Sequence, residues 1–155
     1  MPDVLVGRQP VLEALKAKRP INRILLARDV GRHSTIADIL RLARVAGIPV
    51  EFAPASAITD AAGQLSSQGV LAYTAAKEYA ELDELVPISA SLNEAPLYCI
   101  LDGIEDPHNL GAILRTACAS GVHAVVIRSR RAVGLTSGVA RASAGAVEYV
   151  PVARA

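Results

Sequence analysis

The chain has 155 residues, of which 52% are hydrophobic and 20% are charged, with a formal net charge of +1. These values are typical of a packed globular protein and exclude a disordered tail. No apolar run approaches the roughly 20 residues of a membrane-spanning helix, and the first residues lack the layout of a secretory signal, so we expect a cytoplasmic protein.

The first part of the chain alternates helix-like and strand-like segments. Strands are expected over residues 21–27, 50–53 and 69–74. Helices are expected over residues 7–16 and from an N-cap at Ser34 to Gly47, with a further helical turn capped by Ser56. This order predicts a compact α/β sandwich over residues 1–76.

The next segment, residues 77–96, is acidic and then rich in Ser, Ala, Asn and Pro, which favours a linker with one helical turn at Leu82 to Val86. From residue 97 the alternation resumes. Strands are expected over residues 97–101, 124–128 and 148–152, and helices over residues 109–120 and 136–142. Strands alternating with helices predict a parallel sheet over residues 97–155. A sheet of only three strands favours a domain truncated at its C-terminus.

Charge is distributed unevenly along the chain. Residues 1–45 hold nine Lys and Arg against four Asp and Glu, residues 46–110 hold one against ten, and residues 111–155 hold six against one. Clustered cations of this kind are typical of a polyanion-binding face, because phosphate contacts need local positive charge. Ordinary solvated surface charge is the alternative interpretation.

The two cysteines, Cys99 and Cys118, lie in apolar surroundings without CxxC spacing. No His or Cys cluster accompanies them, so the sequence does not favour a zinc site or a redox motif. We therefore expect buried free thiols and no metal.

Residues 101–117 carry the most specific chemistry of the chain. A strand is expected to end near Asp102, and Asn109 is expected to cap the following helix after a short loop. Ligands of open parallel α/β sheets gather beyond the carboxyl ends of the strands. The asparagine loop and Arg115 are therefore expected to face a common open pocket.

Arg115 falls roughly 130° from the centre of the apolar stripe of this helix, if each residue turns ~100°. Its expected neighbours, Gly111, Ala112 and Ala119, are small enough for a ligand to approach. A guanidinium there could hold a phosphate or ribose oxygen. A solvated surface arginine and an asparagine that only caps the helix are the alternatives, and His108 lacks an identifiable partner for general-base chemistry.

Residues 106–117, Asp-Pro-His-Asn-Leu-Gly-Ala-Ile-Leu-Arg-Thr-Ala, resemble without a gap the first signature motif of SpoU (TrmH-like) RNA 2′-O-ribose methyltransferases, members of the knotted SPOUT superfamily. Residues 142–151 are similar to the family segment that ends the next helix and enters the following strand. Residues 6–15 and 67–70 resemble the L30e-like substrate-binding module of 23S rRNA guanosine methyltransferases. The resemblance implies an L30e-like α/β sandwich followed by the first part of a Rossmann-like α/β-knot sheet.

The resemblance also implies methyl transfer from S-adenosylmethionine to a ribose 2′-hydroxyl of RNA, by a protein that acts as a homodimer. Asn109 and Arg115 match its catalytic positions, with Arg115 holding the target hydroxyl and phosphate and Asn109 organising the loop. Because a guanidinium keeps its proton, we favour electrostatic stabilisation of the developing alkoxide over proton acceptance by Arg115. The donor-binding motifs are expected beyond residue 155, so the chain alone is expected to be inactive.

RNA contacts in the front module are expected from four arginines and a glutamine, namely Arg8, Arg28, Arg32, Arg41 and Gln68. With one Phe and four Tyr, an aromatic stacking platform is not expected, so RNA shape and backbone should dominate recognition. Ser67 stands where family members usually carry His, which leaves the choice of target open. A non-catalytic RNA-binding protein and a small-molecule-binding regulator are the alternative functions.

Overall fold

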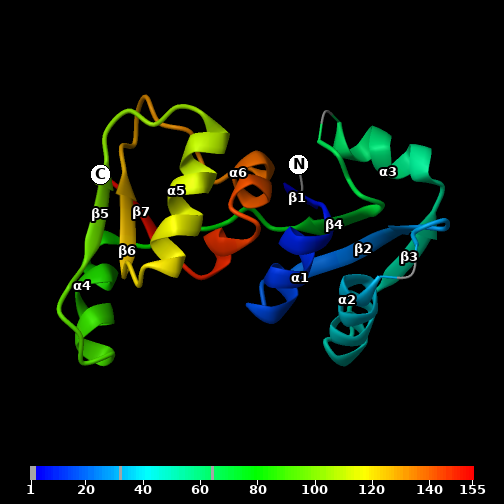
Figure 1. Cartoon of the computed structure of the whole chain (residues 1–155), viewed down its shortest axis with the longest axis horizontal. Coiled ribbons are helices and arrows are strands. Elements are labelled where there is room, and N and C mark those ends of the chain that lie inside the picture. Colours follow the sequence, from blue (N-terminus) through cyan, green and yellow to red (C-terminus); the bar gives the residue numbers. More distant parts are fainter. Residues whose placement is uncertain (1–2, 32, 64) are drawn as a thin grey trace. The chain divides into compact units, whose positions relative to one another are not determined.

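The computed structural model describes residues 3–31, 33–63 and 65–155. The chain divides into two compact units, Met1–Ala76 and Lys77–Ala155, and each unit contains its own sheet. Figure 1 shows the helices and strands of both. The mixed α/β architecture, with a parallel sheet in the second unit, confirms the predicted fold class.

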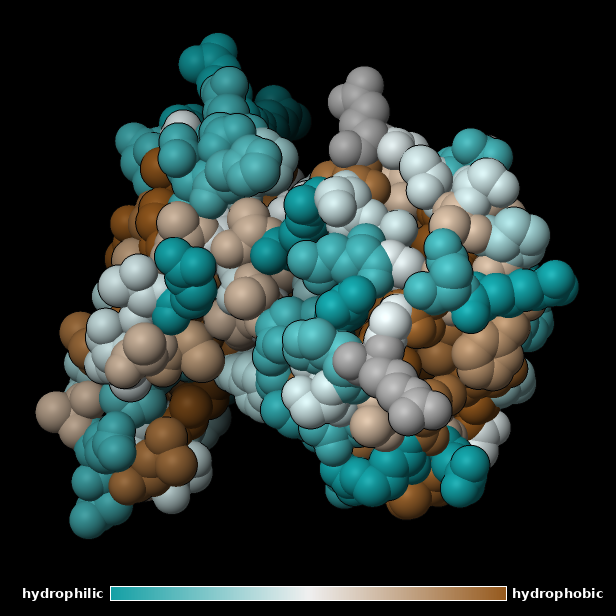
Figure 2. Space-filling view, turned by 45° about the vertical axis from the view of Figure 1, so that its right-hand side comes forward, coloured by the Kyte–Doolittle hydropathy of each residue, from teal (hydrophilic) through white to brown (hydrophobic). Residues whose placement is uncertain are grey.

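Two further properties concern the described residues as a whole. None of their helices is long and apolar enough to cross a membrane. They also contain no group of three or more His, Cys, Asp or Glu side chains that could hold a metal ion. Hydrophilic and hydrophobic side chains are mixed over the face seen in Figure 2.

The first unit is built on a four-stranded sheet in the order β1-β4-β2-β3. Its strands are β1 (Asp3–Val6), β2 (Ile21–Ala27), β3 (Val50–Ala53) and β4 (Val70–Thr74). β4 runs antiparallel to both β1 and β2, whereas β2 and β3 are parallel. β1 was not predicted from the sequence, because a four-residue strand shows too little alternation and is defined by its pairing with the distant β4.

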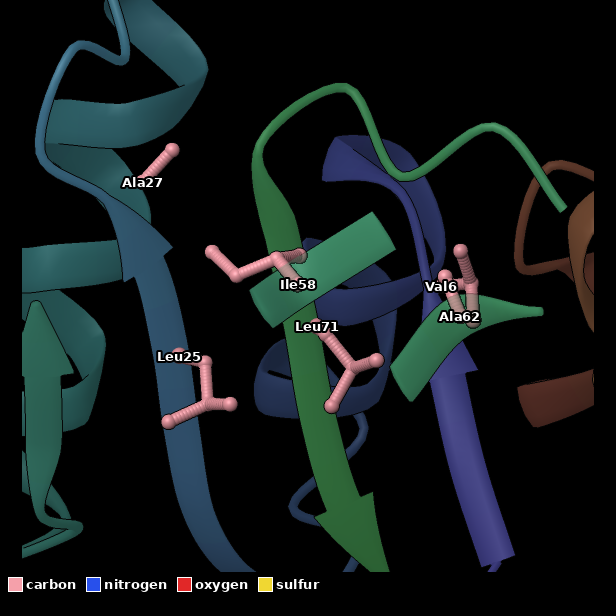
Figure 3. Packing of buried hydrophobic residues seen from close by; sticks show 6 residues of the cluster. All are labelled: Val6, Leu25, Ala27, Ile58, Ala62 and Leu71. Atoms are coloured by element: carbon pink, nitrogen blue, oxygen red, sulfur yellow. The ribbon is translucent and has the colours of Figure 1, made fainter. Parts of the chain in front are cut away.

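Three helices cover this sheet: α1 (Arg8–Lys16), α2 (Ser34–Val45) and α3 (Ala55–Ala62). The N-cap of α2 is His33, whose ring accepts a hydrogen bond from the Thr35 amide, so the prediction that Ser34 caps this helix is wrong by one residue. On the α3 side, Leu25 and Leu71 face each other across β2 and β4 and pack with Ile58 (Figure 3). Burial of such side chains contributes about 1.5–3 kcal/mol each.

The second unit contains three parallel strands in the order β5-β6-β7, namely β5 (Tyr98–Leu101), β6 (Ala124–Ile127) and β7 (Val152–Arg154). The connecting helices are α5 (Pro107–Ala119) and α6 (Ser137–Ala142). Right-handed crossovers between strands added in one direction place both helices on the same face. The strand predicted over residues 148–152 begins only at Val152, because Ala146–Glu148 forms the 3₁₀ turn η1.

The segment over residues 77–96 differs from the expected linker, because it belongs to the second unit and packs on its sheet. It carries α4 (Leu82–Ser91), a ten-residue helix rather than one turn. Leu85 of this helix is 4% exposed and packs against Ala124 and Ala153, and Ala80 forms a parallel bridge with Ala153. The composition suggested a linker because only a few apolar residues of this segment reach the core.

Candidate functional site

The signature segment folds as a loop and a helix at the carboxyl end of β5, as the sequence predicted. Asp106, rather than Asn109, caps α5: its carboxylate accepts a 2.8 Å hydrogen bond from the Asn109 amide. Pro107 follows at the first helical position, where its missing N–H costs nothing. The prediction that Asn109 caps the helix is therefore wrong, and its exposed side chain projects from the first turn.

Arg115 is exposed on α5, and no hydrogen bond or ion pair to it is found within the described parts of the chain. The buried residues of this helix are Leu110, Gly111, Leu114 and Ala117. Arg115 is the sixth residue after Asn109, which places the two about 9 Å apart along the axis and about 120° apart around it. Their Cα atoms therefore do not lie on one face of the helix.

Gly111 has a different role from the one expected. It is buried, and a Cβ atom there would overlap the Ala142 Cβ and lie 2.8 Å from the backbone nitrogen of Ser143. The C-terminal end of α6 thus occupies the space beside Gly111. The glycine allows two helices to pack closely, and the open patch predicted at this point of α5 is closed.

Cationic groups also follow the other two strands of this sheet. Arg128, just after β6, pairs with Asp102, just after β5, across 2.9 Å. Arg154 ends β7, and its guanidinium lies 3.8 Å from the centroid of the Tyr79 ring. Arg128 and Arg154 were not predicted as site residues, although an arginine at the carboxyl end of each of two parallel strands is a pattern that could have identified them.

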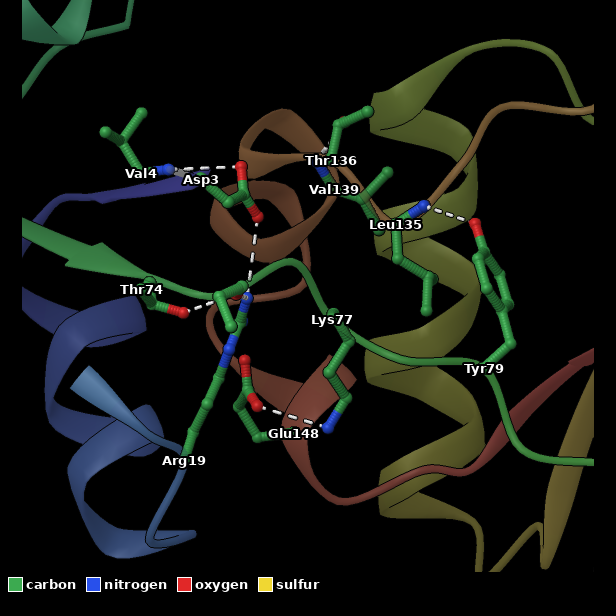
Figure 4. Close-up of polar contacts among 11 residues, drawn as sticks. Asp3, Val4, Arg19, Thr74, Lys77, Tyr79, Leu135, Thr136, Val139 and Glu148 are labelled. Carbon is green, nitrogen blue, oxygen red and sulfur yellow. Dashed lines mark hydrogen bonds and ion pairs between the residues drawn. The ribbon is translucent and has the colours of Figure 1, made fainter. Parts of the chain in front are cut away.

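Tyr79 joins three segments of the second unit, and Figure 4 shows its contact with Leu135. Its hydroxyl oxygen accepts hydrogen bonds from the Leu135 amide at 2.9 Å and from the Arg154 guanidinium at 2.6 Å. Nearby, Lys77 pairs with the buried carboxylate of Glu148 at 3.2 Å. These contacts fix the segment before α4 to the loop before α6 and to the carboxyl end of β7.

The resemblance implies a methyl-donor site, with which two grooves of the second unit can be compared. One groove of the second unit lies beside α5 and β5, with Cys99, Ala112 and Ile113 in its apolar lining. Another lies at the amino end of β7, with Lys77 and Glu148 in its lining, and these two groups already pair with each other. Neither of these two grooves lies at the carboxyl edge of the sheet, so neither fits the donor. The thiols are free, but Cys118 is exposed, which corrects the expectation of two buried thiols.

In the first unit, the carboxyl ends of β1, β2 and β3 lie at the same edge as the amino end of β4, because β4 runs antiparallel to β1 and β2. Each of these three strands leads into a helix, so the N-termini of α1, α2 and α3 gather there. Helix N-termini carry partial positive charge and attract phosphate. This edge is therefore the candidate for the polyanion-binding face expected from the sequence.

Arg8 and Gln68, which are 60 residues apart in the sequence, meet at this edge. The Arg8 amide donates to Oε1 of Gln68 at 3.4 Å, and the Arg8 Nε donates to the Gln68 carbonyl oxygen at 3.2 Å. Gln68 has a positive φ of 51°, in a turn where the Ser67 hydroxyl accepts from the Gly69 amide. Ser67 therefore stabilises the turn that presents Gln68.

The other arginines predicted to contact RNA do not all lie at this edge. Arg28 is exposed directly after β2 and close to the same turn, because the Ala27 amide donates to the Gly69 carbonyl. Arg41 lies seven residues into α2, about 10 Å along the helix from its start, and pairs with Asp38 at 3.3 Å. Arg32 lies outside the described residues. Arg8, Gln68 and Arg28 are thus brought together, and Arg41 is not.

Two known families match the two units of the chain. Residues 4–80 match the family described as RNA 2′-O ribose methyltransferase substrate binding, and residues 96–155 match the SpoU rRNA methylase family. The chain belongs to the SpoU family of RNA methyltransferases, which confirms the resemblance stated for its signature motif.

Relatives agree with this assignment. A protein assigned to the TrmH family of tRNA/rRNA methyltransferases, YacO of Bacillus subtilis, is 44% identical over 153 residues, covering 98% of this chain and 60% of the relative. A similar protein of Staphylococcus saprophyticus is 46% identical over 151 residues, covering 97% and 60%. The chain thus spans about 60% of the length of these relatives.

Solved structures show the same fold. An S-adenosylmethionine-bound rRNA methyltransferase from Sinorhizobium meliloti has a TM-score of 0.74 at 23% identity, covering 98% of this chain and 53% of that one. The SpoU methyltransferase AviRb from Streptomyces viridochromogenes has a TM-score of 0.75 at 22% identity, covering 99% and 53%. At this level of identity the likeness concerns the fold alone.

Proposed function

We propose that the protein containing this chain transfers a methyl group from S-adenosylmethionine to a ribose 2′-hydroxyl of RNA, with 23S rRNA as the substrate. The observation that carries the proposal is the exposed guanidinium of Arg115, which lies in the family's signature helix and has no ion pair within the described parts of the chain. Its place in the signature segment distinguishes it from other exposed arginines of the chain, such as Arg44 on α2.

The chemistry requires a negatively charged 2′-oxygen to develop as its proton leaves and the bond to the methyl carbon forms. The donor, when bound, would supply the methyl group, its carbon–sulfur bond breaking as the carbon–oxygen bond forms, and water would take up the hydroxyl proton. A guanidinium keeps its proton and offers several N–H donors in one plane, so Arg115 holds the neighbouring phosphate and stabilises the developing alkoxide. Asn109, exposed on the first turn of α5 directly after the Asp106 cap, positions the ribose through its amide.

RNA is held by the edge of the first unit that carries Arg8, Gln68 and Arg28. The hydrogen bonds between Arg8 and Gln68 leave the guanidinium able to donate further N–H groups to phosphate oxygens. The three helix N-termini at this edge add backbone dipoles of the same sign. Arg41 is left out of the proposal, because it lies on the flank of α2 and already pairs with Asp38.

The same proposal includes a homodimer and a cytoplasmic location. Apolar side chains exposed on the second unit support association, with Ile100 78% and Val86 67% exposed. Such surface is typical of interfaces between subunits when it forms a contiguous patch. The cytoplasmic location is proposed because the proposed substrate is ribosomal RNA.

The test is methyl transfer from labelled S-adenosylmethionine to a 23S rRNA fragment by the full-length protein. Arg115→Ala should lower the rate by about a hundredfold or more, as for loss of one preorganised donor to a developing oxyanion. Its stability should change by less than about 0.5 kcal/mol, because the side chain is exposed. Arg44→Ala, an exposed arginine on α2, is the control and should keep the wild-type rate. Full activity in Arg115→Ala would refute the assignment.

A further inference from the structure

The first unit contains an open groove that shares only Arg28 with the RNA-binding edge of the proposed function. It has a volume of about 550 Å³ and lies between the loop after β2, the start of α2 and the outermost strand β3. This volume falls within the range of small-ligand sites in proteins. The walls of the groove are mainly apolar, with Val30, Ile36 and Leu40 among the lining residues.

Phe52, the only phenylalanine of the chain, forms one side of this groove. The register pairs Phe52 with the fully buried Leu26, so Phe52 lies on the same face of the sheet. Because β3 is an edge strand, nothing in the sheet covers the outer side of the ring, and 54% of Phe52 is exposed. An aromatic ring at the open edge of an apolar groove is a surface on which another ring can stack.

The polar groups of the groove are cationic or donors. Arg28 lies at its rim, and no carboxylate is found in its described lining. His33 accepts a hydrogen bond from the Thr35 amide at Nδ1 across 3.2 Å, so its neutral ring carries its proton on Nε2, where it can donate. The groove therefore offers a ring, an N–H donor and a positive charge within one lining.

We propose that this groove binds one unstacked base of a single-stranded or bulged RNA, with the base against Phe52 and a flanking phosphate at Arg28. The inference rests on the proposed function in one respect, which is that the partner is RNA. It goes beyond that function by naming a base-binding site. A single aromatic pocket of this kind differs from the extended stacking platform that the aromatic content argues against.

An RNA chain can reach the groove and the cationic edge together. The Ala27 amide donates to the Gly69 carbonyl, so the turn that carries Gln68 lies against the end of β2, where Arg28 follows. Phosphates held near Arg8 and Gln68 would continue towards Arg28 and the groove. Unpaired bases are the part of RNA that proteins read most readily, because their rings are free to stack.

The first experiment uses Phe52→Trp, since the natural chain contains no tryptophan. The probe is an RNA hairpin with a single-nucleotide bulge, and the matched control RNA is the same hairpin without the bulge. The bulged hairpin should quench the emission of the introduced tryptophan, and the paired hairpin should not. Val45→Trp is the control variant: Val45 is 81% exposed near the end of α2 and lies outside the groove lining.

The second experiment compares affinities for the two hairpins. Phe52→Ala should weaken binding of the bulged hairpin by about five- to hundredfold, as for loss of one base–aromatic stack, and should leave the paired hairpin unaffected. Phe52→Trp should keep the affinity. RNA binding without any dependence on Phe52 would overturn this inference and leave the proposed function standing. Absence of RNA binding by the natural chain at low salt would overturn both.

Discussion

The close approach of α5 and α6 makes Gly111 the position at which one methyl group should cost the most. In Gly111→Ala, the new Cβ would overlap the Ala142 Cβ and lie 2.8 Å from both the Ala142 carbonyl carbon and the Ser143 nitrogen. Two of these three atoms belong to the backbone at the end of α6, so rotation of a side chain cannot relieve the overlap. The helices must move apart, and the contacts of Leu110 and Leu114 near Gly111 must loosen with them.

The magnitude follows from two opposing effects. Overpacking a well-packed core costs about 1–3 kcal/mol, and rigid backbone neighbours place this site at the upper end. Replacing glycine by alanine inside a helix stabilises the helix by about 1 kcal/mol. We therefore expect the free energy of unfolding of the second unit to fall by about 2 kcal/mol.

The assay is urea unfolding followed by circular dichroism, with the midpoint read at an unchanged slope. Gly138→Ala is the matched control, because its Cβ would meet the Pro107 Cβ at an ordinary 3.4 Å, and it should be neutral or slightly stabilising. Gly111→Ala combined with Ala142→Gly should recover part of the loss, since only the side-chain overlap is removed. A Gly111→Ala protein as stable as the natural chain would refute the packing argument.

Three further predictions address other contacts. His123 is 6% exposed, and its ring accepts a hydrogen bond from the Leu97 amide at 3.1 Å and contacts Glu94 at 3.2 Å. His123→Ala should therefore lower the free energy of unfolding by about 1–3 kcal/mol, measured by urea titration. An unchanged midpoint would show that the ring is not needed for stability. Tyr79→Phe keeps the ring against Arg154 but removes the oxygen that accepts a hydrogen bond from the Leu135 amide. The free energy of unfolding should fall by about 1 kcal/mol, and hydrogen exchange at the Leu135 amide should become faster. Arg8→Gln should weaken RNA binding and reduce the slope of log affinity against log salt concentration by about one, whereas Arg41→Gln should change neither. Equal effects of the two substitutions would contradict the RNA-binding edge proposed for the first unit.

Much of the fold was predictable because it depends on local pattern. The strand over residues 21–27 and the helix from residue 34 were predicted close to their observed bounds, since apolar periodicity and capping residues act over a few positions. The family was recognisable from residues 106–117 for a related reason, because the loop residues and the helix pattern of its motif lie in one continuous segment of the sequence.

The errors arise where a distant partner decides the outcome. β1 exists because β4 pairs with it, and the segment expected as a linker packs because Leu85 finds Ala124 and Ala153. Asn109 and Asp106 are both good capping residues, and only the backbone path of the loop decided in favour of Asp106.

The sequence by itself determined the order of helices and strands except for β1 and the full length of α4, together with the division into two α/β units and the segment that carries the signature arginine, because these follow from composition and spacing along the chain. Only the tertiary structure decided that α6 fills the space beside Gly111, that Arg8 meets Gln68 while Arg41 stands apart, and that Phe52 borders an open groove. The physical reason is that close packing and hydrogen bonding join residues by distance in space, which spacing along the chain does not encode.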